Sequence, residues 1–192
     1  GINLDFFHPD ATVPREPILL TVGRITPRKD LKTVIDICAS VRSKNPERVF
    51  RAVIVGEPRT ESDKAYAEEM RAYAHTRGVD DCIEWMGALL GEALRKRNQQ
   101  AAVFVTASQS GSLDKVVVES LACGTPVVAK GRTYAQVVGV SSFDNGEDMV
   151  EEISALLVDK TPTQTGRRWV EEHANLDRLL ERIRAHMTLL GA

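Results

Sequence analysis

The chain has 192 residues, of which 43% are hydrophobic and 27% charged, so it can form one substantial domain with a buried core. Its net charge of −2 gives no indication of nucleic-acid binding, and no apolar run approaches the ~20 residues that cross a bilayer. The three cysteines, Cys38, Cys82 and Cys123, lack metal-ligand spacing. We therefore expect buried, reduced thiols in a cytoplasmic protein.

Short continuous apolar runs alternate with helical patterns along the chain. The runs predict strands over 17–23, 50–56, 82–87, 102–108 and 125–129, and a weaker strand over 140–144. Helical spacing of apolar residues predicts helices over 30–45, 62–78, 91–100, 114–123, 147–158, 163–173 and 175–190. Ser62 and Gly78 are the expected caps of the second helix. This alternation favours an α/β fold: a doubly wound, Rossmann-like parallel sheet of about six strands.

The strand-to-helix loops are the expected binding surface, because ligands of doubly wound folds lie beyond the carboxyl ends of the strands. Gly23, Gly56 and Gly87 end the first three predicted strands. A residue without Cβ lets a ligand approach the backbone closely, although the same glycines are explained equally by tight turns.

Two of the three basic residues in the first of these loops, "VGRITPRKD", are candidates for ligand binding. Arg24 follows the strand directly, and Lys29 precedes a predicted helix start. A guanidinium, an ammonium and a helix N-terminus together suit an anion such as a phosphate. The alternative is a pair of solvated surface cations. The loop contains neither a dinucleotide-binding glycine motif nor a Walker lysine.

One acidic residue, Glu119, interrupts the apolar stretch of the helix that follows the loop over 108–115. A buried carboxylate costs several kcal/mol unless it is paired or hydrogen-bonded. Adjacent hydroxyls, such as those of a ribose, would satisfy both of its oxygens. The alternative is that Glu119 faces solvent. Free N–H groups in the first turn, near Asp114 and Lys115, are candidates for phosphate binding.

Six segments in register resemble one family, the GT-B-type retaining glycosyltransferases of the glycogen-synthase-like and mannosyltransferase-like group 1. They are "GINLDFFHP", "ILLTVGRITPRKD", "AVIVGEP", "IEWMGAL", "AVFVTAS" and "DKVVVESLACGTPVVA". The resemblance covers only the C-terminal, nucleotide-sugar-binding half of such enzymes. It implies that residues 1–192 form the donor-binding domain and that the N-terminal acceptor domain is absent from this chain. The final amphipathic helix resembles the one that crosses back to that domain.

The resemblance also implies roles for individual residues. Arg24 and Lys29 would be catalytic, binding the donor diphosphate and stabilising the leaving group, and Glu119 would hold the ribose hydroxyls. Backbone after the third strand would read the base, and backbone before the helix of Glu119 would meet phosphate and sugar. The other implied donor-binding positions are Gly23, Gly87, Ala88, Leu89, Ser112, Leu113, Asp114 and Lys115.

The implied partners are a UDP-, GDP- or ADP-sugar donor and the missing N-terminal domain of the same protein, through which the full-length protein could lie peripherally on a membrane. No cofactor and no metal are expected, because cationic groups would replace a metal in stabilising the departing diphosphate. The isolated chain is expected to bind donor without turnover.

Two departures from the family pattern bear on this reading. Gly111 stands where the family often has a first glutamate, for which Asp114 is a candidate substitute, and Gln136 stands where an acid is usual. Two alternatives accompany the glycosyltransferase: a non-catalytic nucleotide-sugar-binding or scaffolding domain, which the missing acid at Gly111 favours, and a GT-B sugar-nucleotide epimerase.

Overall fold

Six parallel strands form a single sheet in the order β3-β2-β1-β4-β5-β6. The computed structural model describes residues 1–109 and 111–189. The strands are β1 (Glu16–Val22), β2 (Arg51–Val55), β3 (Ile83–Gly87), β4 (Ala101–Thr106), β5 (Val127–Lys130) and β6 (Val140–Phe143). The predicted doubly wound α/β fold is confirmed, including the weak sixth strand, which pairs with β5 at the edge of the sheet.

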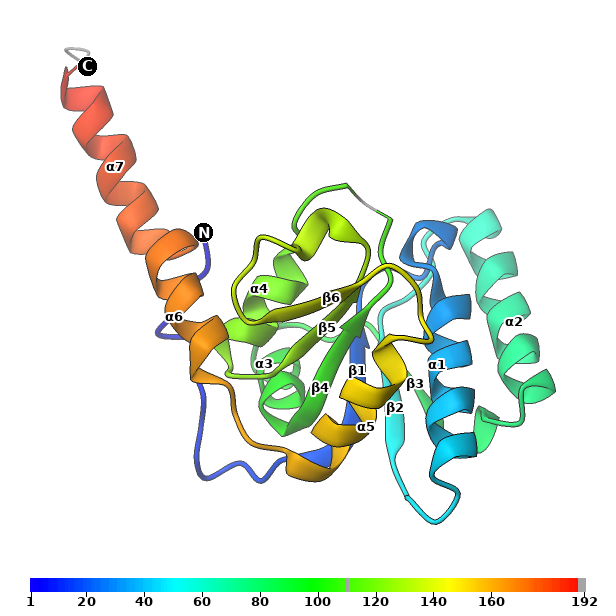
Figure 1. Ribbon diagram of the computed structural model, residues 1–192. Helices are drawn as coiled ribbons and strands as arrows, with labels where there is room; N and C mark the ends of the chain where they lie inside the picture. The colour runs from blue at the N-terminus through cyan, green and yellow to red at the C-terminus, as the bar shows by residue number, and fades with distance from the viewer. Residues whose placement is uncertain (110, 190–192) are drawn as a thin grey trace.

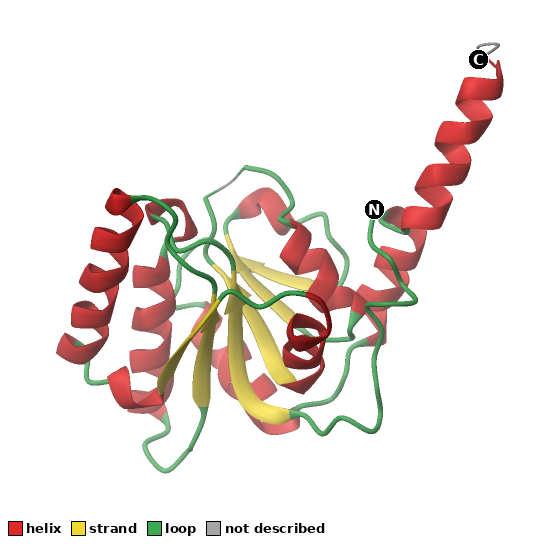
Figure 2. Ribbon diagram, turned by 180° about the vertical axis from the view of Figure 1, so that it is seen from behind, coloured by secondary structure: helices red, strands yellow, loops and turns green. Residues whose placement is uncertain are grey.

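Helices cover both faces of this sheet and create two apolar cores (Figures 1 and 2). On one face lie α1 (Leu31–Lys44), α2 (Glu61–Thr76) and α5 (Met149–Asp159). On the other lie α3 (Gly91–Gln100), α4 (Lys115–Ala122) and α6 (Gln164–His173). Because both faces are covered, the central strands are apolar throughout: Ile18, Leu19 and Leu20 of β1 are fully buried.

The last helix, α7 (Leu176–Leu189), extends away from the body of the domain, and the N-terminus lies beside its base (Figure 1). The backbone of Ile2 forms two hydrogen bonds with the segment that joins α6 to α7. Ile2 N–H donates to Ala174 O at 2.7 Å, and Leu176 N–H donates to Ile2 O at 3.0 Å. The amphipathic helix predicted over 175–190 has apolar residues at helical spacing, of which Leu179, Leu180, Ile183 and Met187 are exposed. Leu190 lies outside the described residues.

The capping prediction for α2 was wrong at both ends. The helix begins at Glu61, so the N-cap is Thr60, and Ser62 lies in the first turn. Thr60 Oγ1 accepts from Asp63 N at 3.1 Å, while the Asp63 carboxylate accepts from Thr60 N at 3.3 Å. These reciprocal bonds form a capping box. Arg77 is the C-cap, and Gly78 follows it in the left-handed region at φ 66°.

The three cysteines are buried and free, as predicted. Burial raises the pKa of the Cys123 thiol to about 12. Within the part of the chain that the structure describes, no helix is long and apolar enough to span a membrane.

The strand order fixes where a ligand site belongs. From β1 the chain proceeds outward through β2 and β3, and then returns to β4 on the opposite side of β1 before continuing to β5 and β6. The order therefore reverses between β1 and β4. In open α/β sheets, ligands bind beyond the carboxyl ends of the strands at such a switch point.

Candidate functional site

The loops that follow β1 and β4 meet at the switch point. The Lys29 ammonium forms an ion pair with Asp114 Oδ2 at 2.7 Å and donates to Ser108 Oγ at 3.3 Å. The backbone of the two loops is also joined, since Gln109 N–H donates to Arg28 O at 2.9 Å. The structure thus brings together two segments some 80 residues apart that were both expected at the binding surface.

The glycines at the strand ends are explained in part by packing. A Cβ on Gly56 would lie 1.9 Å from the Gly23 carbonyl oxygen, and a Cβ on Gly23 would lie 3.0 Å from Lys29 Cε. Gly56 N–H donates to Gly87 O at 2.7 Å, and Gly23 N–H donates to Val55 O at 2.9 Å. These two backbone hydrogen bonds join the ends of β1, β2 and β3. The aliphatic part of the Lys29 side chain packs over Gly23.

Asp114 connects three parts of the site. It occupies the N-cap position of α4, but its side chain makes no capping hydrogen bond among the described residues. Its Oδ2 instead receives Lys29 Nζ and, at 3.3 Å, the hydroxyl of Tyr134, which is fully buried in the turn after β5. The Asp114 side chain therefore leaves the backbone N–H groups of the first turn of α4 uncapped. That turn contains no acidic residue, so it does not repel an anion.

Glu119 is buried, with only 6% of its surface exposed, so the solvent-facing alternative is wrong. The residues around it in α4, from Val117 to Ala122, are buried as well. Burial raises the pKa of Glu119, and the Lys115 ammonium, 3.7 Å from Oε1 and itself mostly exposed, only partly offsets that effect. A carboxylate in this environment favours additional hydrogen-bond donors.

Arg24 differs from Lys29 in having no ion pair or side-chain hydrogen bond within the described chain. It is exposed and directly follows Gly23 at the end of β1. Asp114 neutralises the positive charge of Lys29, so the uncompensated positive charge of this loop comes from Arg24 and Arg28, neither of which forms an ion pair among the described residues.

The remaining predicted donor positions lie on the two flanks of this centre. Gly87 and Leu89 are half-buried and Ala88 is exposed, at the loop after β3. Ser112 and Leu113 are exposed, and Leu113 and Lys115 line a cavity of about 450 Å³ beside the junction of α6 and α7, separate from Lys29. The structure therefore groups Gly23, Lys29 and Asp114 closely, whereas Leu113 borders a different hollow.

Three side chains of the centre received no individual role from the sequence, although two of them, Ser108 and Lys130, lie in loops expected at the binding surface. Ser108 contacts Lys29, and Tyr134 contacts Asp114. Lys130, at the end of β5, contacts Asp30, the residue that follows Lys29. The available signal was their position, because all three lie in or near the loops that follow β4 and β5. In the described residues no group of three or more His, Cys, Asp or Glu side chains is arranged to hold a metal ion.

These features define a Rossmann-like α/β domain with basic side chains and the N-terminus of a helix at its switch point. Residues 16–159 match the family model described as glycosyl transferases group 1, and the chain belongs to that family. Its relatives include the D-inositol 3-phosphate glycosyltransferases of Acidothermus cellulolyticus, 35% identical over 74% of this chain and 30% of the relative, and of Kribbella flavida, 30% identical over 91% and 45%. The chain spans less than half the length of these relatives.

Solved structures share the fold at lower sequence identity. Anabaena HepE in complex with UDP and glucose superposes with a TM-score of 0.80 at 17% identity, over 98% of this chain and 55% of HepE. Sucrose-phosphate synthase from Thermosynechococcus elongatus gives 0.81 at 24% identity, over 100% and 51%. The C-terminal domain of a Francisella tularensis group 1 glycosyl transferase gives 0.75 at 17% identity, over 92% and 100%. The fold is that of a C-terminal GT-B domain, as the resemblance implied.

Proposed function

We propose that this chain is the donor-binding domain of a retaining glycosyltransferase of the hexosyltransferase type, which transfers a sugar from a nucleotide-diphosphate sugar. The observation that carries the proposal is the contact between Lys29 and Asp114, which places an ammonium at the N-terminus of α4 at the switch point, in the loop that also contains Arg24. The group 1 family and the relatives named as glycosyltransferases support sugar transfer, and the neighbour solved with UDP supports a nucleotide donor.

In this proposal Lys29 and Arg24 bind the donor diphosphate. An ammonium has three N–H donors, and the Asp114 and Ser108 contacts use two, so Lys29 retains one for a phosphate oxygen. Arg24 adds a planar guanidinium suited to bidentate phosphate contacts. Negative charge grows on the diphosphate as the glycosidic bond breaks, so cations fixed in advance stabilise the transition state more than the ground state. These groups would do so without a metal.

Glu119 would bind the ribose of the donor. Its buried carboxylate has one described partner, Lys115 at 3.7 Å, which leaves acceptor capacity for two neighbouring hydroxyls. Burial disfavours the charged form of Glu119, and hydrogen bonds from two ribose hydroxyls would stabilise that form. The backbone at Gly87, Ala88 and Leu89 would contact the base at the adjoining strand end.

The acceptor site would lie outside this chain, in an N-terminal domain of the same protein. The relatives are more than twice as long as the parts of them that this chain matches. Four exposed apolar side chains of α7 offer a surface for such a domain. The isolated chain would therefore bind donor without turnover.

A titration of the 192-residue chain with UDP, GDP and ADP, followed by calorimetry or NMR, tests the proposal. Binding should fall from diphosphate to monophosphate to nucleoside, because only the phosphates reach Lys29. Lys29→Ala should weaken diphosphate binding by about 0.5–3 kcal/mol, the range from exposed ion pairs to charge-assisted hydrogen bonds. The nucleoside should bind equally to both proteins.

The matched control is Lys44→Ala, because Lys44 is an exposed lysine that pairs with Glu151 and is the last residue of α1, whose other end lies next to Lys29. It should leave all affinities unchanged. A chain that responds to none of the three diphosphates at several millimolar contradicts the proposal. Equal weakening of diphosphate and nucleoside by Lys29→Ala contradicts the role of Lys29.

A further inference from the structure

Asp30, the residue after Lys29, has an unusual backbone conformation. Its φ of 48° lies in the left-handed region, which only one other non-glycine residue of the described chain, Lys160, adopts. A side chain with a Cβ is strained there unless the surroundings hold it. Asp30 is also the N-cap of α1, so the strained residue connects the turn that carries Lys29 to a long helix.

Two residues, Thr33 and Lys130, hold Asp30 in this conformation. Its Oδ1 accepts from Thr33 N at 3.3 Å, and its Oδ2 accepts from Thr33 Oγ1 at 2.8 Å. Lys130 Nζ donates to Asp30 Oδ2 at 2.9 Å and to Thr33 Oγ1 at 3.0 Å. Burial opposes ionisation of Asp30, but the bonds from Lys130 and Thr33 outweigh it and keep the pKa below its usual value.

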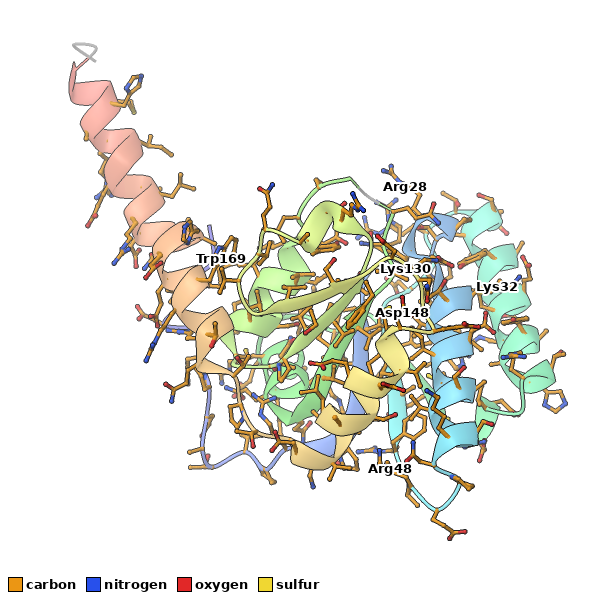
Figure 3. The ribbon with its side chains drawn as sticks, viewed as in Figure 1. Arg28, Lys32, Arg48, Lys130, Asp148 and Trp169 are labelled. Atoms are coloured by element: carbon orange, nitrogen blue, oxygen red, sulfur yellow. The ribbon has the colours of Figure 1, made fainter. Side chains whose placement is uncertain are left out.

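The ion pair from Lys130 is a long-range connection. Lys130 ends β5, whereas Asp30 follows the turn after β1, and β4 lies between these two strands. Its side chain therefore reaches past the end of β4 to the first turn of α1 (Figure 3). The Lys29 side chain contacts Ser108 and Asp114 of the segment after β4. The next residue, Asp30, is bonded through its side chain to Lys130 at the end of β5.

We propose that Lys130 is a positioning residue for donor binding: through its ion pair with Asp30 it fixes the turn that presents Lys29 to the donor diphosphate. The inference rests on the proposed function, because it requires Lys29 to contact the diphosphate. Lys130 and Asp30 are both mostly buried, with side chains 31% and 15% exposed, so the pair is less screened than a surface ion pair. Fixing a cation in advance lowers the ordering cost of binding.

A direct contact between Lys130 and phosphate is the competing explanation, and Asp30→Asn separates the two. Asparagine keeps the capping oxygen and tolerates the left-handed conformation, but it removes the charge that holds Lys130. If Lys130 positions the turn, Asp30→Asn weakens diphosphate binding. If Lys130 binds phosphate itself, releasing it from Asp30 tightens diphosphate binding.

The experiment is a double-mutant cycle on the 192-residue chain, with the tightest-binding of UDP, GDP and ADP and its nucleoside as probes. Lys130→Met should weaken diphosphate binding by about three- to tenfold, the scale of coupling between residues of one network, and leave the nucleoside unchanged. In the Lys29→Ala background, Lys130→Met should have no further effect, because Lys130 acts through Lys29. Lys130→Arg should restore most of the lost affinity.

If Lys130 had a purely structural role, Lys130→Met would weaken the binding of nucleoside and diphosphate alike. The same loss would then appear in the Lys29→Ala background. Either result overturns the inference, as does tighter binding by Asp30→Asn. Should Lys130→Met fail to fold, Asp30→Gly provides the same test, since glycine adopts φ 48° without strain and removes the carboxylate. It should lose diphosphate affinity selectively, and an unchanged affinity overturns the inference.

The proposed function fails in a different way. A wild-type chain that binds no nucleoside diphosphate, or a Lys29→Ala variant that binds as tightly as wild type, overturns the proposed function and this inference with it. Wild-type binding that depends on Lys29 but is insensitive to both Lys130→Met and Asp30→Asn overturns this inference alone.

Discussion

Replacing Glu119 by glutamine should separate binding from stability at the buried carboxylate of α4. The substitution keeps the size of the side chain and removes its charge. Because Glu119 is 6% exposed and its only described partner is a lysine 3.7 Å away, the charged form is poorly compensated in the folded chain. The free energy of unfolding at pH 7 should therefore be unchanged or modestly higher in Glu119→Gln.

Nucleotide binding should respond in the opposite direction. A ribose hydroxyl bonded to a carboxylate is worth about 1.5–3 kcal/mol, so Glu119→Gln should bind the nucleoside diphosphate roughly ten- to a hundredfold more weakly. The matched ligand is the 2′-deoxy diphosphate, which lacks one of the two hydroxyls. Wild type should discriminate against it, whereas Glu119→Gln should discriminate much less.

The pH dependence of the free energy of unfolding tests the environment of Glu119 independently. Burial raises the pKa of Glu119 in the folded chain above its value in the unfolded chain. The folded state thus binds the proton more tightly, and the associated stabilisation is full below the unfolded pKa and lost as pH rises through the folded pKa. The stability advantage of Glu119→Gln over wild type should therefore shrink on acidification from pH 7 to below that range.

Two measurements decide the case: urea unfolding at several pH values, and calorimetric titration with the two diphosphates. Unchanged affinity together with a large loss of stability in Glu119→Gln would refute the reasoning and assign Glu119 to a structural role. Equal discrimination between ribose and deoxyribose ligands in both proteins would refute the hydroxyl contact alone.

Two further outcomes concern the loops after β1 and β2. Arg24→Ala should weaken diphosphate binding by about 0–1 kcal/mol, because Arg24 is exposed, and the difference from wild type should vanish at high salt; a salt-independent loss would contradict a purely electrostatic contact. Gly56→Ala should destabilise the chain by about 2 kcal/mol or more in urea unfolding, because its Cβ would lie 1.9 Å from the Gly23 carbonyl oxygen. The control is Gly78→Ala, also at positive φ but with no atom within 4 Å of the new Cβ, and an equal cost at both positions would show that backbone strain alone is responsible.

The local pattern of the sequence was sufficient for the secondary structure and the fold class. Buried parallel strands must be apolar on both faces, so they appear as continuous runs, and each predicted strand, including the weak one ending near Phe143, is found in the sheet. Helix ends were less well determined. Thr60 and Ser62 are both good N-caps, and only the actual start at Glu61 distinguishes them.

The site was determined by the sequence only in outline. Arg24 and Lys29 could be placed at a binding surface because the carboxyl ends of parallel strands share one edge of the sheet. The pairing of Lys29 with Asp114 depends on the strand order, which puts β4 beside β1, and no local pattern encodes that order. The same holds for Lys130, whose contact with Asp30 spans 100 residues.

The burial of Glu119 is the clearest case of a property that tertiary structure decided. The sequence supplied a carboxylate within an apolar helix and left two environments open. Helix α4 has only eight residues, so its apolar positions cover most of its circumference and do not indicate which side faces the sheet. Packing of α4 against β4, β5 and α6 buries Glu119 and raises its pKa, because burial of a charge depends on neighbours that the chain brings from distant positions.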